Sequence, residues 1–170
     1  PMVAALPREQ AAFAAERRTR ISALYPGKRL VIPAGAAKTR SHDTDYPYRA
    51  HSAFAWLTGW GSDSVSGSVL VLEPTADGHE ATLYFREAAG RDTDEFYANP
   101  EIGEFWTGAR PSLDHVAGDL GLATAGLNEF SARIGISPAY WSRIERGIEK
   151  APRDELIERT ASLLGMSVDE

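Results

Sequence analysis

The stretch SVLVL, residues 68–72, carries the clearest strand signal in the chain. It is a short apolar run between turn-forming residues, which is typical of a buried strand. The turn-forming stretch TADG, residues 75–78, follows it, and the stretch ATLYF, residues 81–85, has the composition of a second strand. Two such runs around a short turn that contains glycine predict a β-hairpin.

Helices are predicted on both sides of this hairpin. Residues 7–25 place apolar side chains at roughly helical spacing, and Pro26-Gly27 ends the run. A short strand is expected at 30–33 and a second helix at about 112–120. The alternation of strands and helices up to about residue 127 indicates an α/β fold. The rest of the chain favours helices alone, namely Phe130–Ile134, Ser137–Arg146 and Pro152–Leu164.

The composition narrows the classes of function. The chain has 170 residues, 43% of them hydrophobic, which is enough for one domain with a sizeable core and a small second one. Its net charge of −6 excludes a globally basic nucleic-acid binder, but a local basic patch stays open. The absence of cysteine excludes disulfides, cysteine-ligated zinc and iron–sulfur clusters. We expect a cytoplasmic protein without membrane contact, because the sequence shows neither a signal-peptide pattern nor an apolar run of ~18 residues.

The polar loop over residues 34–48 carries side chains that could serve a metal or catalytic site. His42, Asp43, Asp45 and His51 are suitable ligands, but adjacent side chains on a strand point to opposite faces and would not converge. A loop whose polar side chains hydrogen-bond its own backbone is the preferred interpretation. Sequence neighbours do not form a Ser-His-Asp triad either, so no catalytic residue, metal or cofactor is expected here.

Two arginines of this region have a structural interpretation. Arg40 and Arg49 lie among Asp43, Asp45 and Tyr46. Guanidinium groups pair bidentately with carboxylates, so we expect these arginines to tie the loop to the sheet.

A longer pattern surrounds the strands. It consists of Pro33-Ala34-Gly35, Arg40, Asp43, Tyr46-Pro47-Tyr48-Arg49, Ser52, Phe54 and Leu57-Thr58-Gly59, followed by SVLVLEP and, later, by GEFWTGARPS. In order and spacing these pieces resemble the N-terminal domain of Xaa-Pro aminopeptidases, the aminopeptidase P branch of the creatinase family, over roughly residues 7–130. The resemblance implies a mixed sheet flanked by helices, with no chemistry in this domain.

In that family, catalysis belongs to a separate C-terminal domain of pita-bread fold, which binds two divalent metals, usually manganese, through Asp, Asp, His, Glu and Glu. Nothing in the present sequence matches that set of ligands. The resemblance further implies that Trp106 could face a peptide substrate of a neighbouring subunit. The alternative, which we prefer, is that Trp106 packs locally against Phe96 or Phe105.

The end of the chain carries a second pattern, GISPAYWSRIERGIEKAPRDELIERTASLLGMSVDE, which resembles the helix-turn-helix domain of Xre-type, lambda-repressor-like regulators. Gly135 suits the turn, Ser137 and Pro138 suit a helix start, and Gly147 suits its end. By this match the recognition helix would span residues 137–147. The residues that would contact DNA, through bases or phosphates, are Ser137, Ala139, Tyr140, Ser142, Arg143, Arg146 and Lys150.

This second match departs from its family at its beginning. Gly126-Leu127-Asn128 lies about two residues too close to the turn glycine, so the motif has lost its first helix or borrows one. The competing interpretation is that these helices cap the sheet or build a dimer contact. We therefore expect two units, an aminopeptidase P N-terminal-like domain at 1–128 and a partial helix-turn-helix at 129–170.

The function expected from the sequence is that of a non-catalytic domain fusion. It would act as a structural or self-association module, not an enzyme, with no small-molecule substrate. The partners expected of such a module are a second copy of the chain, in a homodimer, and DNA, bound weakly. One alternative is a DNA-binding transcriptional regulator that uses the helix-turn-helix. Another is a fragment of a manganese-dependent Xaa-Pro aminopeptidase that lacks its catalytic domain. Whether the fusion is natural or engineered stays open.

Overall fold

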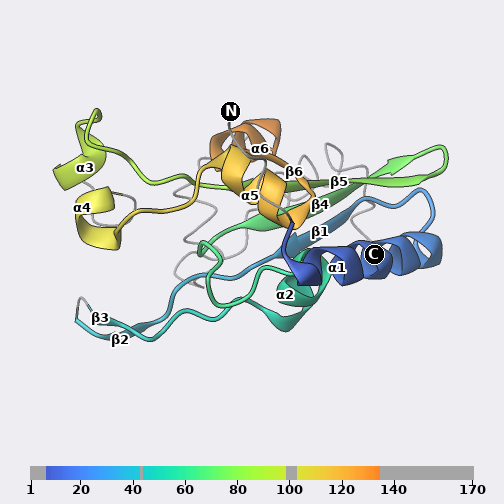
Figure 1. The fold of residues 1–170 in the computed structure, drawn as a ribbon, viewed down its shortest axis with the longest axis horizontal. Helices are drawn as coiled ribbons and strands as arrows, with labels where there is room; N and C mark the ends of the chain where they lie inside the picture. The colour runs from blue at the N-terminus through green and yellow to red at the C-terminus, as the bar shows by residue number, and fades with distance from the viewer. Residues whose placement is uncertain (1–6, 43, 99–102, 135–170) are drawn as a thin grey trace, which may run out of the picture.

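A computed structural model describes residues 7–42, 44–98 and 103–134 (Figure 1). In chain order the elements are α1 (Glu9–Leu24), β1 (Leu30–Pro33), β2 (Thr39–Ser41), β3 (Thr44–Asp45), α2 (Ser52–Thr58), β4 (Val69–Thr75), β5 (Gly78–Phe85), α3 (Glu95–Ala98), α4 (Glu104–Thr107), α5 (Leu113–Leu120), β6 (Ala123–Gly126) and α6 (Leu127–Ile134). The predicted helices at 137–146 and 152–164 lie outside the described residues. None of the described helices is both long and apolar enough to cross a membrane.

The main sheet has the strand order β1-β4-β5-β6. β4 pairs antiparallel with β1 and with β5, whereas β6 pairs parallel with β5, so the sheet is mixed. The predicted hairpin is confirmed, because β4 and β5 pair from Val69↔Tyr84 to Thr75↔Gly78. β2 and β3 form a separate two-stranded sheet. The connection from β5 to β6 is long and contains α3, α4 and α5.

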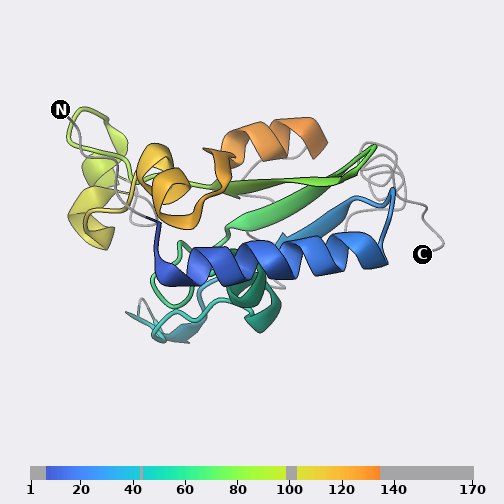
Figure 2. The ribbon, with the colours of Figure 1, turned by 45° about the vertical axis from the view of Figure 1, so that its right-hand side comes forward.

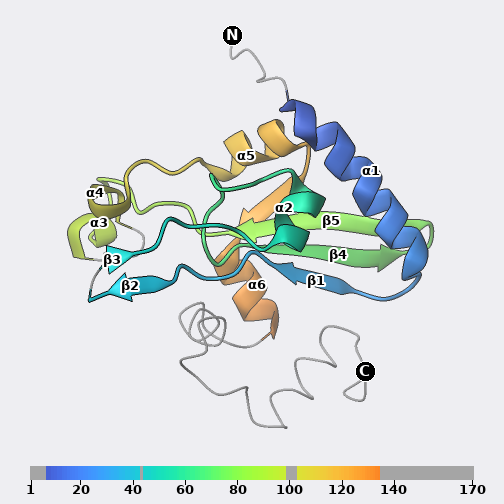
Figure 3. The ribbon, with the colours of Figure 1, turned by 90° about the horizontal axis from the view of Figure 1, so that it is seen from below.

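Both faces of the sheet are covered. Leu70 and Leu72 of β4 belong to one buried cluster, together with Phe54 of α2 and Leu120 of α5. Figure 3 shows α1, α2 and α5 together on that side. Val69 and Val71 of β4 belong to a second cluster on the opposite face, where α6 packs; Figure 2 shows α6 on one side of the strands and α1 on the other. Successive strand residues point to opposite faces, so a continuous apolar run fits a strand that is buried on both sides.

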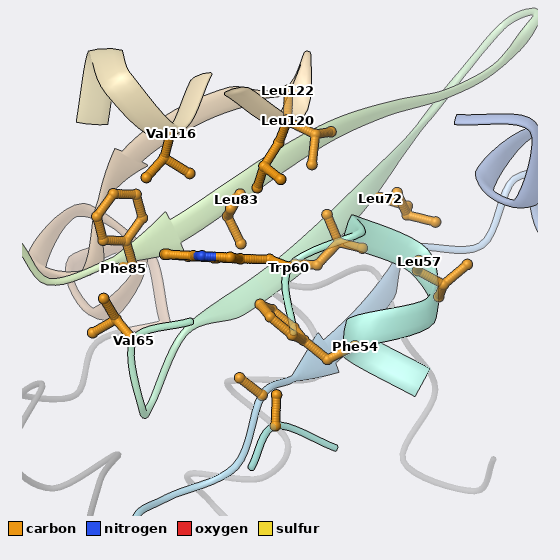
Figure 4. Close-up of a cluster of buried hydrophobic side chains, with 13 residues drawn as sticks. Phe54, Leu57, Trp60, Val65, Leu72, Leu83, Phe85, Val116, Leu120 and Leu122 are labelled. Carbon is orange, nitrogen blue, oxygen red and sulfur yellow. The ribbon is translucent and has the colours of Figure 1, made fainter. Parts of the chain in front are cut away.

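Trp60 lies at the centre of the first cluster (Figure 4). Its ring meets Phe85 edge to face, with the two ring centroids 5.2 Å apart, a favourable arrangement for aromatic pairs. The preceding Thr58 and Gly59 turn the chain from α2 towards this position. Gly59 has a left-handed φ of 75°, and the hydroxyl of Thr58 both donates to the carbonyl of Phe54 and accepts from the amide of Trp60.

Charged side chains fasten α1 to the rest of the fold. Arg8, at the start of α1, pairs with Asp119 of α5 and also reaches Asp63, 3.0 Å away, in the loop after α2. The hydrogen bond to Asp119 raises the pKa of Arg8. Arg18 donates to the carbonyl of Leu57 over 2.8 Å, and burial lowers the pKa of its guanidinium.

The predicted fold class is confirmed, since the sheet is mixed and flanked by helices. The helix expected at 7–25 is α1, and the helix expected at 112–120 is α5, whose start is capped by the side chain of Ser112. The stretch Phe130–Ile134 is helical as expected, but its helix already begins at Leu127. The strand β6 was not anticipated. Its sequence ATAG has small side chains, and its pairing with β5 defines it.

Two phenylalanines provide a matched test of this core. Phe54 is fully buried in the first cluster, whereas Phe13 on α1 is 50% exposed. Phe54→Ala should lower the free energy of unfolding by about 3–5 kcal/mol, because it leaves a cavity in a packed core. Phe13→Ala should cost less than about 1 kcal/mol, as is usual for surface positions. Urea titrations of both variants measure the difference, and equal losses would contradict this assignment of the core.

Candidate functional site

The connection between β5 and β6 carries a group of aromatic side chains that the fold leaves uncovered. Phe96 of α3 is buried, but its neighbour Tyr97 is 66% exposed, and Phe105 and Trp106 of α4 are 56% and 59% exposed. We call these four residues the aromatic tip. They lie at one end of the described part of the molecule, where Figure 1 shows α3 and α4.

The rings of the aromatic tip contact one another in sequence. Ring centroids are 4.6 Å apart between Phe96 and Tyr97, 5.0 Å between Tyr97 and Phe105, and 5.0 Å between Phe105 and Trp106. The indole Nε1 of Trp106 donates a hydrogen bond of 2.8 Å to the carbonyl of Tyr97. These contacts hold Trp106 against Phe105, which agrees with the preferred interpretation that Trp106 packs locally. More than half of the surface of Trp106 is nevertheless exposed. A role towards a peptide substrate stays a prediction.

Acidic side chains surround the aromatic tip. Asp92, Asp94 and Glu95 are exposed immediately before or at the start of α3, and Glu104 begins α4. A cation also lies here: the guanidinium carbon of Arg91 is 5.9 Å from the ring centre of Phe96. In the described residues 91–98 and 103–107, acidic side chains therefore outnumber basic ones.

A second surface feature lies between α1, α2 and the loop before α2. It is a shallow groove of about 690 Å³ lined by Arg17, Pro47, Tyr48, Arg49, Ala50, Ser52, Ala55, Trp56, Gly61 and Ser62. Its lining contains two arginines and no acidic side chain. We call it the basic groove.

The side chains of the basic groove are held in different ways. The guanidinium of Arg17 lies over the ring of Trp56, 5.1 Å from its centre, and donates a 3.0 Å hydrogen bond to the Trp56 carbonyl. The hydroxyl of Tyr48 donates to the carbonyls of Ala34 and Gly35, which anchors the loop. Arg17 and Trp56 are 39 residues apart, so no local sequence pattern could have indicated that they meet.

The expected pairing of Arg40 and Arg49 with neighbouring carboxylates can be examined for Asp45 but not for Asp43. Among the residues that the structure describes, the ion pairs do not include either arginine, and Asp43 lies outside those residues. Both arginines are exposed. The loop is tied down by the Tyr48 hydroxyl instead, so the charge of Arg49 stays available at the edge of the basic groove.

The histidines occupy separate places. His42 is exposed, has a left-handed φ of 48° and stands in the β2–β3 turn. The ring of His51 lies against Gly35, where a Cβ would come within 2.6 Å of Nε2. His79 of β5 joins α1 to the hairpin: Nε2 donates to the Lys28 carbonyl, so Nδ1 accepts from the Ser22 hydroxyl over 2.7 Å. Within ranges 7–42, 44–98 and 103–134, no three His, Asp or Glu side chains come together as metal ligands could.

The residues predicted to contact DNA lie outside the described part of the chain, from Ser137 to Lys150. The described part does include the helix that leads to them. α6 follows β6 directly and packs on the sheet through Leu127 and Phe130, whose ring lies 5.5 Å from that of Tyr84. The segment immediately before α6, within the helix-turn-helix match, is therefore a strand.

Two family models match the chain. A model described as the aminopeptidase P N-terminal domain matches residues 13–135, and one described as a helix-turn-helix domain matches residues 122–170. The two matches overlap over residues 122–135, which hold β6 and α6. The predicted boundary between residues 128 and 129 stays a prediction.

The similarity to curated relatives covers less than a third of the length of each relative. Xaa-Pro aminopeptidase 1 of Streptomyces coelicolor is 41% identical over 153 residues, which is 88% of this chain and 30% of the relative. Xaa-Pro aminopeptidase of Escherichia coli is 31% identical over 113 residues, which is 66% of this chain and 23% of the relative. The chain thus spans less than a third of the length of these relatives.

Solved structures show the same relationship. Aminopeptidase P from Escherichia coli with the inhibitor Pro-Leu matches with a TM-score of 0.57 and 27% identity, over 72% of this chain and 25% of that chain. The zinc-substituted form of that enzyme in complex with product gives a TM-score of 0.58 at 27% identity, over the same shares. With the family-model match over most of its length, the chain belongs to the aminopeptidase P N-terminal domain family.

Proposed function

We propose that this chain is a non-catalytic aminopeptidase P N-terminal-type domain that works as a self-association module. The observation that carries the proposal is the aromatic tip, whose three exposed rings stand together at one end of the fold. A contiguous group of exposed aromatic side chains on a folded domain commonly marks a protein–protein contact. Tyr and Trp are also the residues that contribute most to the binding energy of such contacts.

The relatives support the non-catalytic part of this proposal. They are named Xaa-Pro aminopeptidases, but the similarity covers 23–30% of their length. An activity that depends on the rest of such proteins would not reside in this stretch. We therefore propose that the chain contributes association to an aminopeptidase-like protein and does not itself cleave peptides.

Self-association can be measured directly. Size-exclusion chromatography with light scattering over a wide concentration range should show a mass above the 18.5 kDa of one chain, with the larger species gaining as concentration rises. Replacing Tyr97 and Phe105 with Ser should shift the equilibrium towards the monomer by at least tenfold in Kd, because the exposed rings would be lost. A wild-type chain that stays monomeric at all concentrations would refute the proposal.

Catalysis has an equally direct test. The chain incubated with manganese and an Xaa-Pro peptide should release no N-terminal residue above the uncatalysed rate. Full-length Escherichia coli aminopeptidase P under the same conditions is the positive control. Metal-dependent turnover that co-elutes with the purified chain would contradict a non-catalytic role.

DNA binding is a second candidate function, and the helix-turn-helix match at 122–170 favours it. We propose that Ser137, Ala139, Tyr140, Ser142, Arg143, Arg146 and Lys150 would form the contact surface. Residues 133–153 hold five basic and two acidic side chains, a local charge of +3 in a chain of net charge −6. This charge fits weak, salt-sensitive binding through phosphates.

The salt dependence of DNA binding tests this second candidate. Each neutralised phosphate contributes about −0.9 to the slope of log K against log salt concentration, so three contacts predict a slope near −3. Replacing both Arg143 and Arg146 with Ala should flatten the slope by about 1.8, without unfolding the protein. The matched control replaces the exposed Arg20 and Arg40, and should leave the slope unchanged. Binding that responds equally to both double variants would reject the assignment to the helix-turn-helix segment.

A further inference from the structure

We propose that the basic groove of one copy of this chain receives the aromatic tip of a second copy, in a reciprocal dimer. This inference rests on the proposed self-association and names the two surfaces that produce it. Both surfaces are built by the described residues, and they are complementary. The basic groove combines positive charge with the exposed ring of Trp56, and the aromatic tip combines negative charge with exposed rings.

The basic groove is partly organised before any partner arrives. Arg17 is fixed by its stacking on Trp56 and by its hydrogen bond to the Trp56 carbonyl, while the indole of Trp56 stays 50% exposed. A guanidinium that lies over an indole presents a flat surface on which another ring can pack. Arg49, at the edge of the groove, is exposed and has no ion pair within the described residues. Its charge can therefore meet a carboxylate of a partner.

The aromatic tip supplies the complementary groups. Asp92 and Asp94 are exposed, and no ion pair within the described ranges includes them. Asp94 directly precedes α3 and Asp92 lies two residues earlier, so both belong to the segment that leads into the aromatic tip. An aspartate paired with Arg49, with Tyr97 or Phe105 against Trp56, would combine a charged pair with aromatic packing. Interfaces are enriched in this combination of arginine and aromatic residues.

The two surfaces lie on different elements of the same fold. Figures 1 and 3 both show α3 and α4 at one end of the described part, apart from α1 and α2, which line the basic groove. Because α3 and α4 are separated from α1 and α2 within one chain, we infer that contact between tip and groove joins two copies. When each copy offers its tip to the groove of the other, the contact occurs twice and closes a two-fold dimer.

Charge reversal tests this pairing with full-length chains. Arg49→Glu makes the groove repel a tip, and Asp94→Arg makes the tip repel a groove. Each variant alone should dimerise at least tenfold more weakly than wild type, because like charges would face each other in both contacts. An equimolar mixture should recover the dimer, because the reversed groove then meets the reversed tip and the two native surfaces meet each other. The matched control Arg40→Glu reverses another exposed arginine, one that makes no ion pair among the described residues, and should leave dimerisation unchanged.

Light scattering and analytical ultracentrifugation provide the readout, with circular dichroism to confirm that every variant is folded. The pairing of groove and tip is supported if each single variant dimerises more weakly than wild type and the equimolar mixture recovers dimerisation. If both single variants dimerise as strongly as wild type, or if the mixture dimerises no more strongly than the single variants, the pairing of groove and tip is wrong. Self-association itself would still be supported by the wild-type dimer. A wild-type chain that is monomeric throughout refutes self-association itself, so the two failures are distinguishable.

Discussion

Strand β4 places four consecutive apolar side chains, Val69 to Leu72, in the interior, two on each face of the sheet. Each side chain is at most 2% exposed, so neither face of the sheet can be left to water. The helices follow from this requirement. α1, α2 and α5 cover one face and α6 covers the other, and the hydrophobic effect that drives this coverage is the main favourable contribution to folding.

The same arrangement decides where the basic groove and the aromatic tip lie. α2 must cover Leu70 and Leu72, and α1 must lie beside α2, so Arg17 meets Trp56 and the basic groove forms between these helices. β6 must pair parallel with β5, which requires a long connection back along the sheet. That connection has room for α3 and α4, on which Tyr97, Phe105 and Trp106 are exposed.

The sequence predicts the parts of this fold whose signal is local. The hairpin of β4 and β5, helix α1 and helix α5 have clear periodicity or composition, and the resemblance to the aminopeptidase P N-terminal domain supplies their assembly. β6 escapes prediction because Ala, Thr and Gly give no apolar signal, and its backbone pairing with β5 defines it. The sequence shows the aromatic residues of the aromatic tip, but not that three of them are exposed. Their exposure depends on how the connection between β5 and β6 runs in three dimensions. The loop anchor also escapes prediction: among the described residues the ion pairs do not include Arg49, whereas the Tyr48 hydroxyl donates to the carbonyls of Ala34 and Gly35.

Helix α6 also bears on how such a chain can evolve. Both family models match residues 122–135, of which residues 123–134 form strand β6 and helix α6. Phe130 is 3% exposed and packs against Tyr84, so a substitution there would be selected first for its effect on the sheet. Any adaptation of the following segment to a new partner would have to spare that contact. Exposed positions of the same helix, such as Asn128, Glu129 and Ala132, are free to drift, and divergence among relatives should concentrate there.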